Sequence, residues 1–267
     1  MKRDLIRLLA GILTITGLFS CAGPGYAPSQ AASASGGTDS SEMARSSGMA
    51  PQRHPAERSG LATGWGQEKI SSVSDRSFVR ASSQPAGTDA IYYNNPEGIE
   101  AMGGDLQRVA GMQSAAGGLV EWGMKGRMGF LAAYKESGYG RRLVAGERKE
   151  TYTIVLRNRS RSTLEIVASV DGLDVMDGKR AAFSKRGYLV NPGATFEIKG
   201  FRTSYESVAA FKFSNVANSY ANLRHGDTRN VGVIGIAVFT QKGSRPWATP
   251  PNEIRQRNSA SPFATAP

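Results

Sequence analysis

Apolar and polar residues alternate along the second half of the chain, which is the pattern of β-strands with one buried face. The clearest alternation covers residues 164–170, where Leu, Ile, Ala and Val occupy every second position. Residues 151–156 have the same period, and the polar run 158–162 separates the two segments. Two strand patterns joined by a short polar stretch predict a β-hairpin.

Further strand patterns follow at residues 188–190, 195–199, 207–214 and 231–239. The last of these is apolar on both faces, which predicts a central, fully buried strand. Turn signals such as Asn191-Pro192-Gly193 separate the segments. We therefore expect an all-β fold, an antiparallel β-sandwich of immunoglobulin-like or jelly-roll type, over residues 128–241.

Residues 59–127 are less regular, and two interpretations stay open: a separate small unit, or an arm packed on the sandwich. Apolar residues in the stretch 99–113 recur near helical spacing, although Gly103 and Gly104 interrupt it. Residues 242–267 are rich in Pro, Ser, Thr and Ala, which predicts a mobile tail that Trp247 or Phe263 pins locally.

The first twenty residues have the pattern of a secretory signal. Lys2, Arg3 and Arg7 precede an apolar run over residues 8–19, which is long enough for a signal core and too short to span a bilayer. The low-complexity stretch 21–58 has almost no large apolar residues, so we expect a disordered tether there.

The signal ends in Leu18-Phe19-Ser20-Cys21, which resembles the lipobox of bacterial lipoproteins, with Phe19 departing from the usual small or aliphatic residue. The resemblance implies acylation of Cys21 and membrane anchoring through its lipid. Ala22 follows the cysteine, and by analogy with Gram-negative sorting this implies the outer membrane. The alternative is an ordinary secretory signal that is cleaved after Ala22 or Ala27.

The arrangement of the β-rich module also carries a resemblance. A strand followed by DGLDVMDG, Ser-Lys-Arg-Gly-Tyr, Asn-Pro-Gly and Asn-Val-Gly-Val-Ile-Gly resembles bacterial envelope proteins of uncharacterised function. This resemblance implies the fold and supplies no mechanism.

Composition narrows the possible chemistry. Cys21 is the single cysteine, which excludes an intramolecular disulfide and any multi-cysteine metal site, and there are only two histidines. The formal net charge is +11. This balance favours anionic partners such as lipid headgroups or polysaccharides, although an excess of charge also serves solubility.

Three aspartates at spacings of three, Asp171, Asp174 and Asp177, form the best acidic cluster. A turn that carries three carboxylates is a candidate Ca²⁺ site, but the spacing is not that of an EF-hand. The alternative is a turn whose aspartates accept backbone N–H groups and pair with nearby bases.

A hydrolase is a second candidate class. His225 and Asp227 lie close together in the sequence, with Ser214 and Ser219 as possible nucleophiles, and the Asp171–Asp177 turn would complete a cleft. No nucleophile elbow or oxyanion-hole motif accompanies them, so we expect no enzyme activity and no cofactor.

Basic and aromatic residues on the predicted loops are the candidate binding groups, at one end of the sandwich. They are Arg157, Arg159, Arg161, Lys179, Arg180, Lys185, Arg186 and Tyr188. Such groups suit an anionic glycan or a protein partner of the envelope, and for an exported protein nucleic acid is not expected. A structural subunit of a surface assembly is a third possibility, and its sign would be an exposed apolar patch or an unpaired edge strand.

Overall fold

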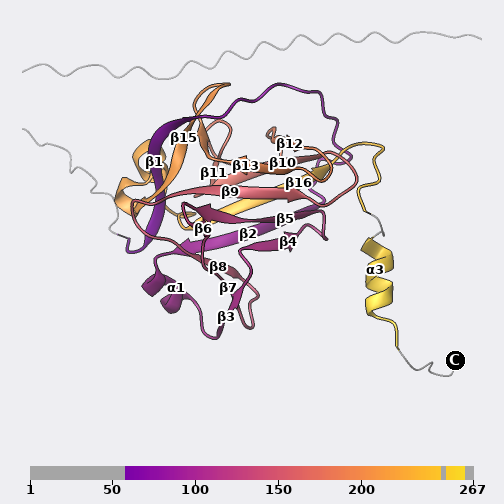
Figure 1. Ribbon diagram of the computed structural model, residues 1–267, viewed down its shortest axis with the longest axis horizontal. Helices are drawn as coiled ribbons and strands as arrows, with labels where there is room; N and C mark the ends of the chain where they lie inside the picture. Colours follow the sequence, from indigo (N-terminus) through magenta and orange to yellow (C-terminus); the bar gives the residue numbers. More distant parts are fainter. Residues whose placement is uncertain (1–57, 248–250, 262–267) are drawn as a thin grey trace, which may run out of the picture. The chain divides into compact units, whose positions relative to one another are not determined.

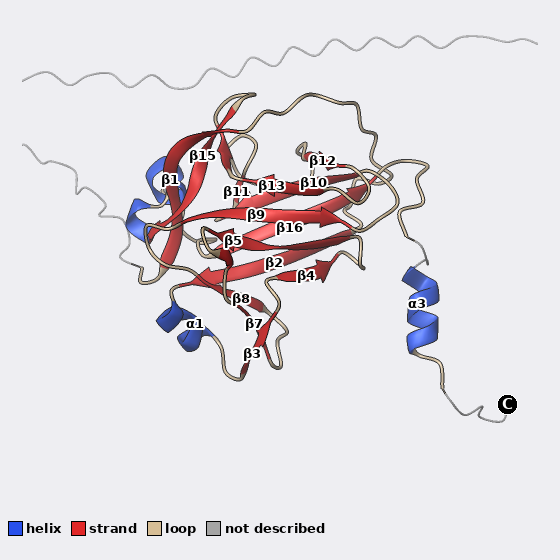
Figure 2. Ribbon diagram, in the orientation of Figure 1, coloured by secondary structure: helices blue, strands red, loops and turns tan. Residues whose placement is uncertain are grey.

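Two β-sheets packed together form the described part of the chain, and the predicted all-β sandwich is thereby confirmed. The computed structural model describes residues 58–247 and 251–261. Strands dominate these ranges (Figure 2). The predicted signal, lipobox and tether lie outside the described residues, apart from Arg58.

The first sheet combines long strands with several short ones (Figure 1). They are β1 (Leu61–Ile70), β4 (Met112–Ala115), β5 (Val120–Gly126), β6 (Gly129–Phe130), β9 (Thr151–Asn158), β13 (Thr195–Ile198), β14 (Gly200–Arg202) and β15 (Ser207–Asn215). Their hydrogen-bonded order is β1-β15-β9-β5-β4, with β13 paired to β9, β14 to β15 and β6 to β5.

The second sheet is built around the apolar strand near the C-terminal end of the sandwich. Its members are β2 (Gly87–Asn94), β3 (Leu106–Val109), β7 (Ala133–Glu136), β8 (Arg142–Ala145), β10 (Leu164–Val170), β11 (Leu173–Asp174), β12 (Tyr188–Val190) and β16 (Val233–Thr240). The order is β11-β10-β16-β2-β8-β7-β3, and β12 also pairs with β10. The predicted central strand, β16, indeed lies between β10 and β2.

One strand pair departs from the antiparallel pattern. β2 and β8 are parallel, with Ile91 opposite Arg142. Parallel neighbours need a long crossover, and here residues 95–141 make it by passing through both sheets. Strands β1 to β5 therefore belong to the two sheets, so the sandwich begins at Leu61 rather than at residue 128.

The predicted hairpin between residues 151–156 and 164–170 is wrong, because β9 and β10 lie in different sheets. The connecting turn folds around the buried side chain of Asn158. Its amide donates to the carbonyls of Ser162 and Val190, both at 2.8 Å, and its Oδ1 accepts from Ser160 N and Oγ. These hydrogen bonds satisfy the polar groups of the turn in which the chain crosses from one sheet to the other.

Helices are short. They are α1 (Pro96–Met102), the 3₁₀ turn η1 (Val216–Asn218), α2 (Tyr220–His225) and α3 (Pro251–Asn258). The helical spacing predicted for residues 99–113 ends early, since α1 ends at Met102 and strands β3 and β4 follow Gly103 and Gly104. Among the described residues, no helix is long and apolar enough to cross a membrane.

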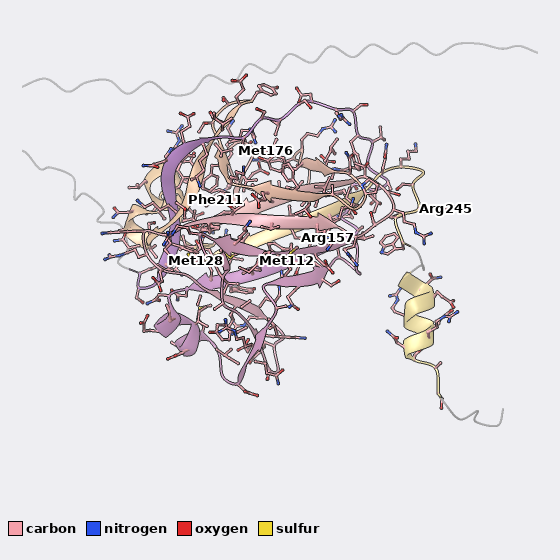
Figure 3. All side chains as sticks on the ribbon, viewed as in Figure 1. Met112, Met128, Arg157, Met176, Phe211 and Arg245 are labelled. Atoms are coloured by element: carbon pink, nitrogen blue, oxygen red, sulfur yellow. The ribbon has the colours of Figure 1, made fainter. Side chains whose placement is uncertain are left out.

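Aromatic side chains fill the space between the sheets. Tyr152 stacks on Phe211 and Phe213 at centroid distances of 5.2 and 4.5 Å, and Figure 3 labels Phe211 within this layer. Trp122 is fully buried in the same core. Trp247 packs against the core as predicted for the tail, whereas Phe263 lies outside the described residues.

Candidate functional site

The predicted basic groups do not share one end of the sandwich. Arg157, Arg159 and Arg161 surround the turn before β10, whereas Lys179 and Arg180 follow its far end. A strand of this length separates its ends by roughly 20 Å. Figure 3 shows Arg157 and Met176, one from each region, lying apart. The fold therefore divides the predicted cluster into two groups.

Several of these bases are occupied by acids or carbonyls. Arg159 lies 3.6 Å from Glu121, Arg180 lies 3.2 Å from Asp227, and Lys185 lies 2.7 Å from Asp177. Exposed ion pairs of this kind are weak, so their basic groups can still bind another anionic partner.

The predicted Tyr188 is not a surface residue. Its side chain is buried against Phe196, and its hydroxyl accepts from Arg202 Nε at 3.2 Å. It contributes only part of one wall to a surface groove of the described part of the chain.

That groove has a volume of about 1020 Å³ and lies beneath the chain segment 71–79, which we call the arch. Its far wall comes from β12, from residues 202–205 and from residues of β10 and β13. We call this cavity the arch groove. Of the predicted binding residues, Arg186 and Tyr188 line it, and the others do not.

The arch is held in place by guanidinium and backbone contacts. Val73 N donates to Tyr205 O at 2.9 Å. Arg202 Nη1 donates to Ser71 O at 2.7 Å, and Arg186 Nη1 donates to Phe78 O at 3.1 Å. Two arginines that line the groove thus also fasten the two ends of the arch.

A buried ion pair anchors the chain where it leaves the arch. Arg80 Nε lies 2.7 Å from the Glu165 carboxylate, and the Glu165 side chain is only 1% exposed. Glu165 also accepts from Gly187 N at 2.9 Å, while Arg80 stacks over the Phe239 ring. Strand β10 therefore holds both the end of the arch and the loop that precedes β12, through Glu165.

The chemistry of the arch groove is polar and mildly basic. Arg76, Arg186 and Arg202 face Asp75 and the already paired Glu165. Hydroxyl and amide groups supply further donors and acceptors: Ser72, Ser74, Ser77, Thr163, Asn191, Thr203, Ser204 and Gln241. The exposed aromatic ring of Tyr205 lies among them. Such a surface can hydrogen-bond a hydroxylated, negatively charged ligand.

The three aspartates of the predicted acidic cluster are engaged separately. Asp174 accepts from Met176 N at 2.8 Å, and burial raises its pKa. Asp177 accepts from Lys179 N at 2.9 Å and pairs with Lys185, whose charge lowers the Asp177 pKa despite partial desolvation. Within the described ranges, no group of three or more potential metal-ligand side chains converges.

Asp171 instead points between the two sheets. Its carboxylate accepts from Tyr93 Oη at 2.6 Å, Thr63 N at 2.8 Å and Gly232 N at 2.9 Å. The Thr63 hydroxyl lies 2.8 Å from Tyr93 Oη and 2.6 Å from Tyr152 Oη. The result is a buried chain of hydroxyls that joins strands of both sheets to one carboxylate.

Burial is the main cause of the pKa shifts in this network. Desolvation raises the pKa of Asp171 to about 6, although hydrogen bonds to the carboxylate oppose the shift. Desolvation and the nearby carboxylate also raise the pKa values of Tyr93 and Tyr152. None of these residues lines the arch groove, so the perturbed groups of the network serve packing between the sheets rather than that site.

The proposed hydrolase residues are not arranged for nucleophilic catalysis. His225 Nε2 lies 2.8 Å from Gly178 O, and Asp227 pairs with Arg229, which holds the Asp227 pKa well below its usual range. The Ser219 hydroxyl donates to Val216 O and accepts from Asn222 N as the N-cap of α2. Ser214 Oγ donates to Asn215 O at 3.0 Å. No histidine–serine contact forms among these groups.

Sequence patterns did not identify most of the arch groove. Arg76 lies in an irregular segment, and Arg202 is the last residue of the short strand β14. The run Ser-Ser-Val-Ser-Asp-Arg-Ser at residues 71–77 was the available signal, since it is a polar loop with a single base.

Comparisons with known proteins add no relative: no family model, no curated protein and no solved structure matches this chain.

Proposed function

We propose that this chain is a lipid-anchored, non-catalytic protein of the bacterial cell envelope whose β-sandwich binds an anionic glycan in the arch groove. The observation that carries the proposal is the groove itself, in which Arg76, Arg186 and Arg202 lie among hydroxyl and amide groups. Its volume, about 1020 Å³, is sufficient for an oligosaccharide segment.

The location rests on the lipobox-like ending at Cys21, on the residue Ala22 and on the signal that precedes them. An outer-membrane position would place a basic protein next to anionic polysaccharide and lipid headgroups. Removal of residues 1–20, which hold three basic side chains and one acidic one, would leave a net charge of +9, which would favour encounter with such polymers through long-range attraction.

Binding of a sulfated heparin hexasaccharide, compared with neutral maltohexaose, tests the proposal by calorimetry at low and moderate salt. We expect saturable binding of the sulfated probe alone. Arg76→Ala should weaken it about threefold, as expected for the loss of one exposed ionic contact. Arg108→Ala removes an exposed arginine of β3 that does not line the groove, and should leave binding unchanged.

Equal affinity for both oligosaccharides, or equal effects of the two substitutions, would contradict a glycan site in the groove. Crosslinking of a partner protein that Arg76→Ala abolishes would favour the protein-binding alternative. Time-dependent shortening of the sulfated probe would favour the hydrolase class instead.

A further inference from the structure

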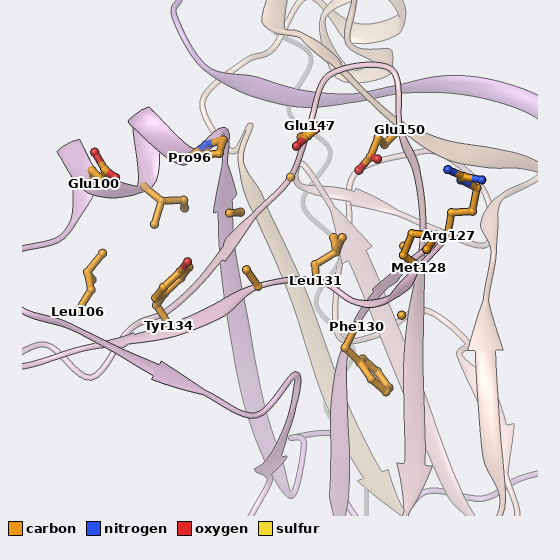
Figure 4. Close-up of a pocket in the computed structure, with 16 residues that line it drawn as sticks. Pro96, Glu100, Leu106, Arg127, Met128, Phe130, Leu131, Tyr134, Glu147 and Glu150 are labelled. Atoms are coloured by element: carbon orange, nitrogen blue, oxygen red, sulfur yellow. The ribbon is translucent and has the colours of Figure 1, made fainter.

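A second cavity, of about 560 Å³, lies beside the β5–β6 hairpin and shares no lining residue with the arch groove. Its walls come from α1, from the hairpin residues 126–130, from β7 and from the loop between β8 and β9 (Figure 4). We call it the hairpin pocket. Cavities of this size typically hold small organic ligands.

The inner surface of the hairpin pocket is apolar. Ile99, Leu106, Leu131 and Tyr134 line it, and Figure 4 shows Leu106, Tyr134 and Leu131 following one another along the wall. At the hairpin, Met128 is 89% exposed and Phe130 is 46% exposed, and both line the same pocket. Large exposed apolar side chains that gather at one cavity mark an interaction site.

Three carboxylates surround this apolar surface. Glu100 extends from α1, and Glu147 and Glu150 lie on the β8–β9 loop above Leu131 in Figure 4. Within the described part of the chain, none of the three carboxylates has an ion pair or a side-chain hydrogen bond. Arg127 is the one base of the pocket lining.

The loop that carries two of these carboxylates is held firmly. Glu150 N donates to Glu147 O at 3.1 Å. The backbone of Phe213 makes two further bonds: Phe213 N donates to Glu150 O at 2.9 Å, and Phe213 O accepts from Lys149 N at 2.8 Å. Lys149 adopts a positive φ of 76° at this turn. Arg148 and Lys149 are exposed and do not line the pocket, so the turn presents its acids, and not its bases, to the cavity.

We propose that the hairpin pocket binds a small amphiphilic cation, a free molecule with an alkyl or aryl body and an ammonium head. The body packs on Leu106, Leu131 and Tyr134, and the head lies between Glu147 and Glu150. Charge complementarity selects the sign of the ligand, because apolar walls alone would accept an anion equally well. This site is separate from the arch groove and takes the opposite charge.

Calorimetric titration with octylamine, octanoate and octanol at pH 7 tests the proposal on the purified chain. Octylamine should bind saturably, octanol more weakly, and octanoate not at all. Glu147→Gln/Glu150→Gln should weaken octylamine binding about tenfold, because two exposed ionic contacts are lost. Glu206→Gln removes an exposed acid that does not line the hairpin pocket, and should leave the affinity unchanged.

Ala132→Leu provides an independent variant, since it adds bulk to the pocket lining without changing charge. It should reduce octylamine binding while the thermal unfolding temperature stays near that of the parent. Octanoate binding as tight as octylamine, or full affinity in the double glutamine variant, would overturn the proposal. Absence of saturable octylamine binding, or a lysine-rich peptide binding more than tenfold tighter than octylamine, would overturn it as well.

Discussion

At the residue scale, Asp171 shows how position between two sheets changes the chemistry of a side chain. The sequence predicts it in an acidic turn, and in the fold its carboxylate is buried among Tyr93, Thr63 and Gly232. Its backbone φ is 55°, in the left-handed region that Asp and Asn tolerate better than most residues. Desolvation raises the pKa of the buried Asp171 carboxylate, and the hydrogen bonds that it accepts lower that pKa.

Stability should depend on pH through this residue. The Asp171 pKa is about 6 in the folded chain against 3.8 as its ordinary value, so between these pH values the folded state binds a proton that the unfolded state has released. The associated stability is present below pH 4 and is lost as pH rises through 6, by about 3 kcal/mol at most. Urea unfolding from pH 4 to 7 measures the slope.

The Asp171→Asn side chain cannot titrate, so the variant should lose that contribution to the pH slope. Its amide nitrogen would face the Thr63 N–H, which should lower the free energy of unfolding by about 1–3 kcal/mol. Asp227→Asn is the control, since the pKa of Asp227 is held far below this window by Arg229. An unchanged slope in Asp171→Asn would show that Asp171 does not carry the pH dependence.

At the scale of elements, the arch depends on strand β10 through the Arg80–Glu165 pair. The Glu165 side chain is 1% exposed and that of Arg80 16% exposed. Arg80→Ala should destabilise the fold by about 3–5 kcal/mol, because it leaves a buried carboxylate without its counter-charge. Denaturant unfolding measures the loss, and hydrogen exchange should show faster opening of residues 71–79.

The second substitution Glu165→Gln in the Arg80→Ala background should recover part of the stability, since the amide oxygen can still accept from Gly187 N. Arg229→Ala, which breaks an exposed pair with Asp227, should have no measurable effect by comparison. Equal effects of Arg80→Ala and Arg229→Ala would show that burial of the pair does not control its contribution.

At the scale of the whole molecule, the central prediction concerns the anchor. Metabolic labelling with a palmitate analogue should mark the wild-type chain in the membrane fraction, and Cys21→Ala should lose both the label and the membrane residence. The reason is that the lipobox resemblance implies three acyl chains at Cys21, and several acyl chains anchor stably, whereas one alone binds marginally. A soluble, unlabelled wild-type chain would contradict the lipoprotein assignment.

Local patterns alone were enough to predict the all-β class and many strand positions. β10, β12, β13, β15 and β16 lie within a residue or two of their predicted ranges, because alternation and turn residues are encoded in short windows. β16 was also predicted to be central, since a strand with two apolar faces needs a neighbour on each side and a layer on each face.

Which strands pair was decided only by the tertiary structure. β9 and β10 resemble a hairpin locally, yet β9 pairs with β5, β13 and β15, and β10 pairs with β11, β12 and β16. Asn158, a polar residue in a polar run, becomes the buried bridge between layers only because Val190 lies opposite it. Sheet membership depends on contacts distant in sequence, which a local pattern does not contain.

The same physical reason explains which parts of the candidate sites were predictable. Arg186 was predicted from local charge, but the arch groove also needs Arg76 and Arg202, which come from segments far apart in the sequence. The sequence by itself determined the composition, the net charge and the strand periodicity. The tertiary structure decided which charges are paired, which are buried and which face a cavity, because these properties arise from long-range packing.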